Sequence, residues 1–504
     1  MDLNKRDSAS SGAVYQYVSQ VVFLLSGLAF YAFLMHQLAS SFVGEVVLIS
    51  TLVQIFSGVL SLNLQYAFAH FISYSIDDTD ASAHIARKFL LVSLFLSILS
   101  FPIFYLIAPL FSVILFHTSA EVHILRFSSI YLSLSVASGL ISGILYGFQR
   151  FRKVNVERAV SSIIGYALAG IIAVVFGSII GVIIALSIGQ IYFISLLLYR
   201  NPAFQRLRHK TSSPVKMGQV VAYSLPVILT VFVGNSANHL DKLVAAAFMS
   251  VSSVGVYNLS LMVAAGLYGA IQSINQILLP KMSEIFASHN ISALNDMADR
   301  SVRMLTFIFV PASLGLVAIS TQVTIFIGGG GYLDAVFPLR LILFIAALSC
   351  PVIVISVIPS AIRKTKISYL VAPVSFATNL GLSLVLIPRF GIDGAAIGFA
   401  ALYPLRFAIL YFYSVRWISL KIRILPLVKT WLASTGMLVI VWTIGYTSGF
   451  QPVSLVYLVP LGTAFYFIFA RAMKILRHDD IDMFLDMIPV RLKVFRKILA
   501  SLSG

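Results

Sequence analysis

Residues 179–199 read IIGVIIALSIGQIYFISLLLY, an apolar run without a single Lys, Arg, Asp or Glu. A bilayer core of about 30 Å is crossed by about 20 helical residues at a rise of 1.5 Å each. A strand of a membrane barrel would instead alternate polar and apolar side chains over about 10 residues. The run therefore predicts a transmembrane helix, and this choice decides the fold class.

The whole chain shares this character. Of its 504 residues 59% are hydrophobic and 11% charged, with a mean hydropathy of +0.96, whereas soluble domains carry about 25% charged residues. This composition excludes a soluble enzyme, a disordered scaffold and a disulfide-stapled secreted domain. Cys350 is the single cysteine, which also excludes a cysteine-rich metal site. The first apolar run is too long for a cleavable signal peptide.

Similar apolar runs recur along the chain and predict an all-α integral membrane protein with about 14 transmembrane helices. The predicted spans are 14–35, 46–68, 89–110, 124–146, 159–176, 179–199, 219–248, 256–279, 304–327, 336–358, 367–387, 392–413, 427–446 and 455–470. An even number of spans places both termini on one side of the membrane.

The basic residues orient these spans, because Lys and Arg are concentrated in cytoplasmic loops. With a cytoplasmic N-terminus, all but five of the 35 Lys and Arg residues fall in cytoplasmic segments or, as Lys429 does, at the cytoplasmic end of a span. The five exceptions are Arg126, Lys242, Arg340, Arg389 and Arg406. The net charge of +17 is thus explained by topology, and nucleic-acid binding is unnecessary. We predict a multi-pass protein of the cell (plasma) membrane with both termini in the cytoplasm.

A weak internal repeat groups the spans into two lobes. SFVG at residues 41–44 recurs 211 positions later as SSVG at 252–255, and at the same offset Gly58 and Gln65 fall on Gly269 and Gln276. Two six-helix lobes in the same orientation imply a pseudo-two-fold axis along the membrane normal. Such lobes enclose a central cavity that opens to either side by rocking.

The chain is thereby divided into six segments. They are a cytoplasmic N-terminus (1–13), an N-lobe of spans one to six (14–199), a basic cytoplasmic linker (200–218), a C-lobe of spans seven to twelve (219–413), two added spans (427–470) and a cytoplasmic tail (471–504). The tail alternates apolar, acidic and basic residues at helical spacing, which predicts an amphipathic helix on the inner leaflet.

Polar side chains inside the predicted spans are the candidate substrate contacts, because amides and charges facing lipid cost several kcal/mol. In span two they recur at the spacing of one helix face, and span seven adds a stripe with charges. Hydrogen bonding between helices is the alternative interpretation. The cavity candidates are Gln54, Ser61, Gln65, Asn235, Asn238, His239, Asp241, Lys242, Gln272, Gln276 and Arg406.

The charges in the spans are mainly basic. Asp241 is the only clearly embedded acid, whereas Lys242 and Arg406 supply candidate interior cations. Arg126 and Arg340 lie near outer span ends, where anchoring at the interface is the favoured interpretation. A pump for cationic drugs needs embedded carboxylates, whereas surplus cations suit an anionic cargo such as a lipid diphosphate.

No catalytic motif is recognisable. The run of four glycines at 328–331 lacks the Lys-Ser/Thr of a phosphate-binding loop, and the nine His show no zinc pattern. We predict that the protein is not an enzyme and has no cofactor, metal or ATP site. Transport energy would come from an ion gradient (H⁺ or Na⁺), the membrane potential or substrate supply.

Two motifs resemble those of polysaccharide flippases related to the O-antigen flippases, within the multidrug, oligosaccharidyl-lipid and polysaccharide exporter (MOP) superfamily. They are Asp241-Lys242-Leu243-Val244 followed by VGVYN at 254–258, and LIPRFGIDGAA at 386–396. The resemblance covers residues 10–415. It implies movement of a polyprenyl- or dolichyl-diphosphate-linked oligosaccharide from the inner to the outer leaflet by alternating access. Relatives that flip lipid II carry arginines in the first two helices, and spans one and two here have none.

The predicted function is therefore a flippase for a lipid-linked oligosaccharide in cell-surface polysaccharide or glycan assembly. Lys242 and Arg406 would contact phosphate, Asp241 would hold Lys242 or couple an ion, and the amide stripes would bind sugar hydroxyls. The predicted partners are this substrate, membrane lipids and glycan-assembly enzymes, and the protein is predicted to be a monomer. The alternatives are an ion-coupled multidrug or small-molecule extruder and a non-transporting membrane scaffold.

Overall fold

A computed structural model describes residues 9–199, 217–224 and 239–475, and every regular element in these ranges is a helix. The contacts divide the chain into two compact units, Met1–Gly255 and Val256–Gly504. The predicted all-α membrane fold is confirmed. The N-terminus, most of the linker and nearly all of the tail lie outside the described residues, so the amphipathic tail helix stays a prediction.

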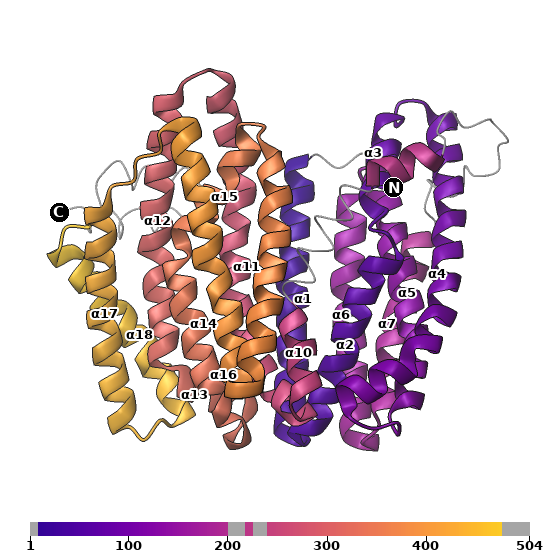
Figure 1. The fold of residues 1–504 in the computed structure, drawn as a ribbon, viewed down its shortest axis with the longest axis horizontal. Helices are drawn as coiled ribbons and strands as arrows, with labels where there is room; N and C mark the ends of the chain where they lie inside the picture. The colour runs from indigo at the N-terminus through magenta and orange to yellow at the C-terminus, as the bar shows by residue number, and fades with distance from the viewer. Residues whose placement is uncertain (1–8, 200–216, 225–238, 476–504) are drawn as a thin grey trace. The chain divides into compact units, whose positions relative to one another are not determined.

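Unit 1 is organised around α5, most of which is buried. This helix contacts α2, α3, α4 and α7 (Figure 1), and α6 packs between α1 and α7. Large apolar side chains on the outer helices, such as Leu106 and Phe176, are exposed, as a lipid-facing surface requires. The helices of unit 1 are α1 (Ala9–Gln37), α2 (Ser40–Leu60), α3 (Gln65–Tyr74), α4 (Thr79–Phe116), α5 (Val122–Gly147), α6 (Phe151–Phe176), α7 (Ile179–Leu198), a helix over 217–224 and α10 (Leu240–Phe248).

Unit 2 is organised around α12, which packs against α14, α15 and α17. The last two helices belong to this core, because the Tyr466 hydroxyl of α18 donates to the carbonyl of Phe307 at 2.6 Å. Its helices are α11 (Val251–Ala287, which begins in unit 1), α12 (Ile291–Ala318), α13 (Ser320–Gly328), α14 (Val336–Leu348), α15 (Cys350–Ala361), α16 (Ser368–Ile418), α17 (Ile424–Thr447) and α18 (Leu455–Ala472). Short 3₁₀ turns lie at Gly330–Ala335, Thr365–Ile367 and Pro452–Ser454.

Twelve helices of the described residues are long and apolar enough to cross a membrane. The difference of two spans from the predicted total has two sources. Predicted spans eleven and twelve are counted together as α16, in which a kink at Gly391 (φ 59°, ψ −136°), a backbone conformation open mainly to glycine, separates two helices. Span seven is described only at its ends, 217–224 and α10, so it stays a prediction as a span.

The two copies of the sequence repeat meet within unit 1. Ser40 and Ser252 hydroxyls lie 2.6 Å apart. A Cβ atom placed on Gly255 would be 2.6 Å from the carbonyl oxygen of Ser40, and one on Gly44 would overlap the carbonyl oxygen of Val251. The starts of α2 and α11 therefore touch backbone to backbone, which only glycine permits.

A buried ion cluster fastens the loop before α17 to α12. Asp299 is 3% exposed, and its carboxylate accepts hydrogen bonds of 2.8 Å from both the backbone N–H and the Nε of Arg423. The Nε of Arg303, one turn along α12, lies 3.3 Å from the same carboxylate. Asn295 donates to the carbonyl of Ile418 at 2.6 Å. Together these bonds satisfy a charge that burial would otherwise penalise.

Replacing Asp299 with Ala should lower the thermal unfolding midpoint of the detergent-solubilised protein by several degrees. The change leaves two cations facing a vacated buried position, at a cost of about 3 kcal/mol. Asp296→Ala is the matched control, because Asp296 is exposed on the same helix and its loss should cost less than about 0.5 kcal/mol. Equal midpoints for the two variants would contradict this role of Asp299.

Candidate functional site

The predicted second span is interrupted by a tight turn. Helix α2 ends at Leu60 and α3 begins at Gln65, and two successive residues between them, Leu62 and Asn63, have positive φ angles of 51° and 45°. Asn tolerates the left-handed region better than most residues, so it suits this break. Ser61, Asn63 and Leu64 are all at most 4% exposed, which makes the break an internal feature.

The buried backbone of the break is satisfied locally. The N–H of Leu62 donates to the carbonyl of Val59 at 3.0 Å and that of Leu64 to the carbonyl of Ser61 at 3.1 Å. The Ser61 hydroxyl accepts from the N–H of Asn63 at 3.3 Å. The Gln65 amide donates to the Asn63 side-chain oxygen at 3.4 Å. The Nδ2 of Asn63 is buried without a hydrogen-bond partner among the described residues, so it is a donor available to a ligand.

The break corrects the prediction of one polar face on span two. Gln54 lies in α2 and Ser61 directly follows the end of that helix, whereas Gln65 starts α3. The spacing that places residues on one face of a single helix therefore does not apply to Gln65. Gln54 is exposed and Gln65 half-buried. Asn63 was missed because it lies off the predicted face. Its signal in the sequence is an Asn flanked by leucines inside an apolar run.

Helix α5 holds the break in place by close contact. A Cβ atom on Gly143 would lie 2.6 Å from both the Cα and the carbonyl oxygen of Gln65. Gly139, one turn earlier on the same helix, has no atom within 4 Å of such a Cβ. Replacing Gly143 therefore tests close packing, whereas replacing Gly139 tests helix propensity alone.

The charges of predicted span seven gather at the start of α10. His239 precedes the helix, Asp241 is completely buried in its first turn, and Lys242 is half-buried. Lys242 interacts electrostatically with both Asp241 and His239. A carboxylate at a helix N-terminus is also stabilised by the helix dipole. The helix is tied to α4, because the His117 ring nitrogen lies 3.1 Å from the carbonyl of Ala246.

Three tyrosines from separate helices of unit 1 form a second polar cluster. Tyr31 of α1, Tyr131 of α5 and Tyr166 of α6 interact with one another and are half-buried. The Tyr31 hydroxyl pairs with Ser50, and the Tyr131 hydroxyl pairs with Gln190 of α7. No pattern in the sequence predicts this cluster, because its members are separated by up to 135 positions.

In unit 2, Arg406 of α16 lies beside an aromatic pair. Tyr268 of α11 and Tyr403 stack with ring centroids 5.2 Å apart and an interplanar angle of 12°. Arg406 interacts electrostatically with Tyr268, and its Nε donates to the Ser375 hydroxyl at 3.0 Å. This arrangement leaves the guanidinium charge beside hydroxyls and rings rather than a carboxylate.

Two further span arginines are held in the same manner. The Nε of Arg340 donates to Ser320 at 2.7 Å, and its terminal nitrogen donates to Thr321 at 3.0 Å. The guanidinium of Arg126 lies 4.6 Å from the ring centroid of Tyr105. The remaining candidates are outside the description: Asn235 and Asn238 lie in 225–238, and no side-chain position is described for Gln272 and Gln276.

Several solved membrane-protein structures have a similar fold. The lipid II flippase MurJ in an inward closed conformation is 19% identical, with a TM-score of 0.71 over 90% of this chain and 97% of that one. An outward-facing multidrug resistance MATE family transporter of the MOP superfamily is 13% identical, with a TM-score of 0.57 over 81% and 94%. A Vibrio cholerae MATE transporter is 15% identical, with a TM-score of 0.56 over 81% and 98%. A search of curated proteins gives no match.

The chain therefore has the same fold as these solved flippase and transporter structures. A family model described as "Polysaccharide biosynthesis protein" matches residues 52–337, more than half of the chain. The chain belongs to this family, as the resemblance of its motifs indicated. The matched range includes the broken second span and the Asp241-Lys242 motif.

Gly143→Ala should lower the thermal unfolding midpoint, because the added methyl group forces α5 and the break apart at a cost of about 1–3 kcal/mol. Gly139→Ala, with open space around its Cβ, should leave the midpoint unchanged or raise it slightly through helix propensity. Thermal unfolding of both purified variants measures the difference. A Gly143→Ala protein as stable as Gly139→Ala would refute the close contact at Gln65.

Proposed function

We propose that this transporter is a flippase that moves a polyprenyl- or dolichyl-diphosphate-linked oligosaccharide from the inner to the outer leaflet. The observation that supports this proposal most is the set of contacts made by three arginines in the predicted spans. Arg126, Arg340 and Arg406 contact hydroxyls or aromatic rings and form no ion pair with a carboxylate among the described residues. A positive charge left uncompensated in a low-dielectric region attracts an anionic cargo strongly.

Arg406 and Lys242 are the proposed phosphate contacts. The guanidinium of Arg406 keeps N–H donors beyond the one used for Ser375, and a planar fork of donors matches two phosphate oxygens at once. Lys242 offers a point charge whose position is stabilised by the adjacent Asp241. Protonation of Asp241, or binding of Na⁺ there, would weaken this attraction and provide a route for ion coupling.

Hydroxyl and amide groups are the proposed sugar contacts. In unit 1 they are the cluster of Tyr31, Tyr131, Tyr166 and Gln190 together with the Asn63 amide. In unit 2, the stacked Tyr268 and Tyr403 add aromatic faces next to Arg406. Tyrosine suits sugars because it combines an apolar ring with a hydrogen-bonding group.

Alternating access requires a contact that breaks when the protein opens to the other side. The contact of Ser40 with Ser252, and of Gly44 with Val251, joins the start of α2 to the start of α11. The charge distribution predicts that both helix starts lie on the outer side. We assign this contact to a closed outer gate.

Combined replacement of Lys242 and Arg406 by Ala should reduce flipping by about 100-fold or more. Hydrogen bonds to charged groups contribute about 1.5–3 kcal/mol each, and two are removed. The assay reconstitutes the protein in vesicles and follows a fluorescent polyprenyl-diphosphate oligosaccharide across the bilayer. The exchange K242R, which keeps the charge at that position, should retain most of the activity.

A second variant, D241N/K242Q/R406Q, serves as the control for correct folding. It keeps the approximate side-chain shapes and neutralises Asp241 together with its partner Lys242. It should purify with a wild-type elution profile and flip as poorly as the Ala variant. Wild-type flipping rates in both neutralised variants would disprove the assignment of these residues.

The gate is tested by a disulfide. In S40C/S252C the two sulfur atoms replace hydroxyl oxygens only 2.6 Å apart, so oxidation should join them at the usual length of about 2.05 Å. Because the native Cys350 is buried, it does not compete. Oxidation should stop flipping and reduction should restore it, while either single cysteine variant stays active under both conditions. Full activity of the oxidised double variant would exclude opening at this contact.

A further inference from the structure

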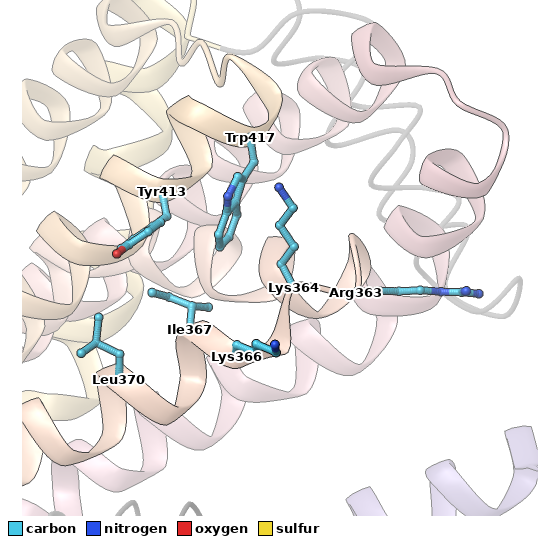
Figure 2. A pocket seen from close by; sticks show the side chains of 7 residues that line it. All are labelled: Arg363, Lys364, Lys366, Ile367, Leu370, Tyr413 and Trp417. Carbon is cyan, nitrogen blue, oxygen red and sulfur yellow. The ribbon is translucent and has the colours of Figure 1, made fainter.

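A basic pocket lies in unit 2 where the turn after α15 meets the last turns of α16. Its accessible volume is about 500 Å³, within the range of small-ligand sites. Lys364 and Lys366 stand on one side and Tyr413 and Trp417 on the other, with Ile367 between them and Leu370 beyond it on the side of Tyr413 (Figure 2). The Lys364 ammonium lies 4.9 Å from the centroid of the Trp417 ring, so the cation is held in place by the aromatic wall.

The turn that carries these cations has an unusual residue at its centre. Helix α15 ends with the N–H of Lys364 donating to the carbonyl of Pro359 at 2.7 Å and the N–H of Arg363 donating to that of Ser360 at 3.2 Å. This is the Schellman arrangement, whose left-handed position is usually occupied by glycine. Arg363 occupies it here with φ 60°.

The chemistry of the lining selects the ligand. Three cations border the pocket, and no Asp, Glu, Asn or Gln is among the seven residues that line it. The site therefore fits a phosphate group but lacks the amides and carboxylates that recognise sugar hydroxyls. The apolar side is lipid-accessible, since Leu370 is 45% exposed. A ligand with both a phosphate and an acyl chain uses both sides.

We propose that this pocket binds the phosphate headgroup of an anionic phospholipid from the inner leaflet. Lys364 and Lys366 contact the phosphate, and an acyl chain lies along Leu370 and Ile367. Arg363, whose exposed side chain points away from the other lining residues (Figure 2), adds positive charge at the rim. The charge distribution predicts that the turn faces the cytoplasm, where anionic headgroups attract basic residues next to membrane helices. The pocket shares no residue with the proposed phosphate contacts Arg406 and Lys242. Lipid binding at the pocket can therefore be tested independently of the proposed flippase activity.

The test measures lipid binding by the purified full-length chain. Protein in phosphatidylcholine nanodiscs is titrated with a short-chain fluorescent phosphatidylglycerol, and in parallel with a polyprenyl diphosphate and with inorganic phosphate. K364A/K366A should weaken phosphatidylglycerol binding by about tenfold or more. The matched control K281A/K474A removes two exposed lysines of unit 2 that lie outside the pocket, and it should bind like wild type.

A second variant separates binding from folding. R363G places glycine where the backbone favours it, so thermal stability should be unchanged or higher while phosphatidylglycerol binding weakens. Equal weakening in K281A/K474A, or unchanged binding in both pocket variants, would overturn the proposal. Binding of polyprenyl diphosphate or inorganic phosphate without phosphatidylglycerol would also overturn it, because the occupant would then be the cargo or a free anion.

Discussion

The cost of placing polar groups in hydrocarbon governs this structure. Backbone and charged groups away from water must find partners inside the protein. The turn between α2 and α3 meets this demand with bonds made by its own residues, including the Ser61 hydroxyl. Asp299 meets it with two arginines. Where a donor is left over, as at Asn63 Nδ2, the same cost makes that atom a candidate ligand contact.

This constraint also connects the structure to the proposed cargo. Two buried carboxylates of the described residues are matched by cations, Asp299 by Arg423 and Asp241 by Lys242. Arg406 and Arg340 are matched only by neutral hydroxyl groups. The balance of charge in the spans is consequently positive. An anionic lipid diphosphate completes that balance, whereas a cationic drug would add to it.

The apolar runs of the sequence predicted the features of the fold that depend on the length of each run. The helices, their order and the junction between spans eleven and twelve at Gly391 followed from apolar length alone. The repeat at 41–44 and 252–255 predicted two lobes, but the contact between Ser40 and Ser252 is a finding of the structure. The break at Ser61–Leu64 did not follow, because leucine has no preference for the left-handed conformation of Leu62, and the contact of Gly143 with Gln65 that holds the break joins distant parts of the sequence. The tyrosine cluster needs three helices to come together, and a linear pattern carries no such information.

The most direct test of the account compares two cargoes in one preparation. Vesicles containing the purified protein are supplied with a fluorescent polyprenyl-diphosphate oligosaccharide and, separately, with a fluorescent cationic drug, with and without H⁺ and Na⁺ gradients. The account predicts protein-dependent movement of the anionic lipid-linked sugar and no accumulation of the drug. Drug transport with the sugar lipid left in its original leaflet would contradict it.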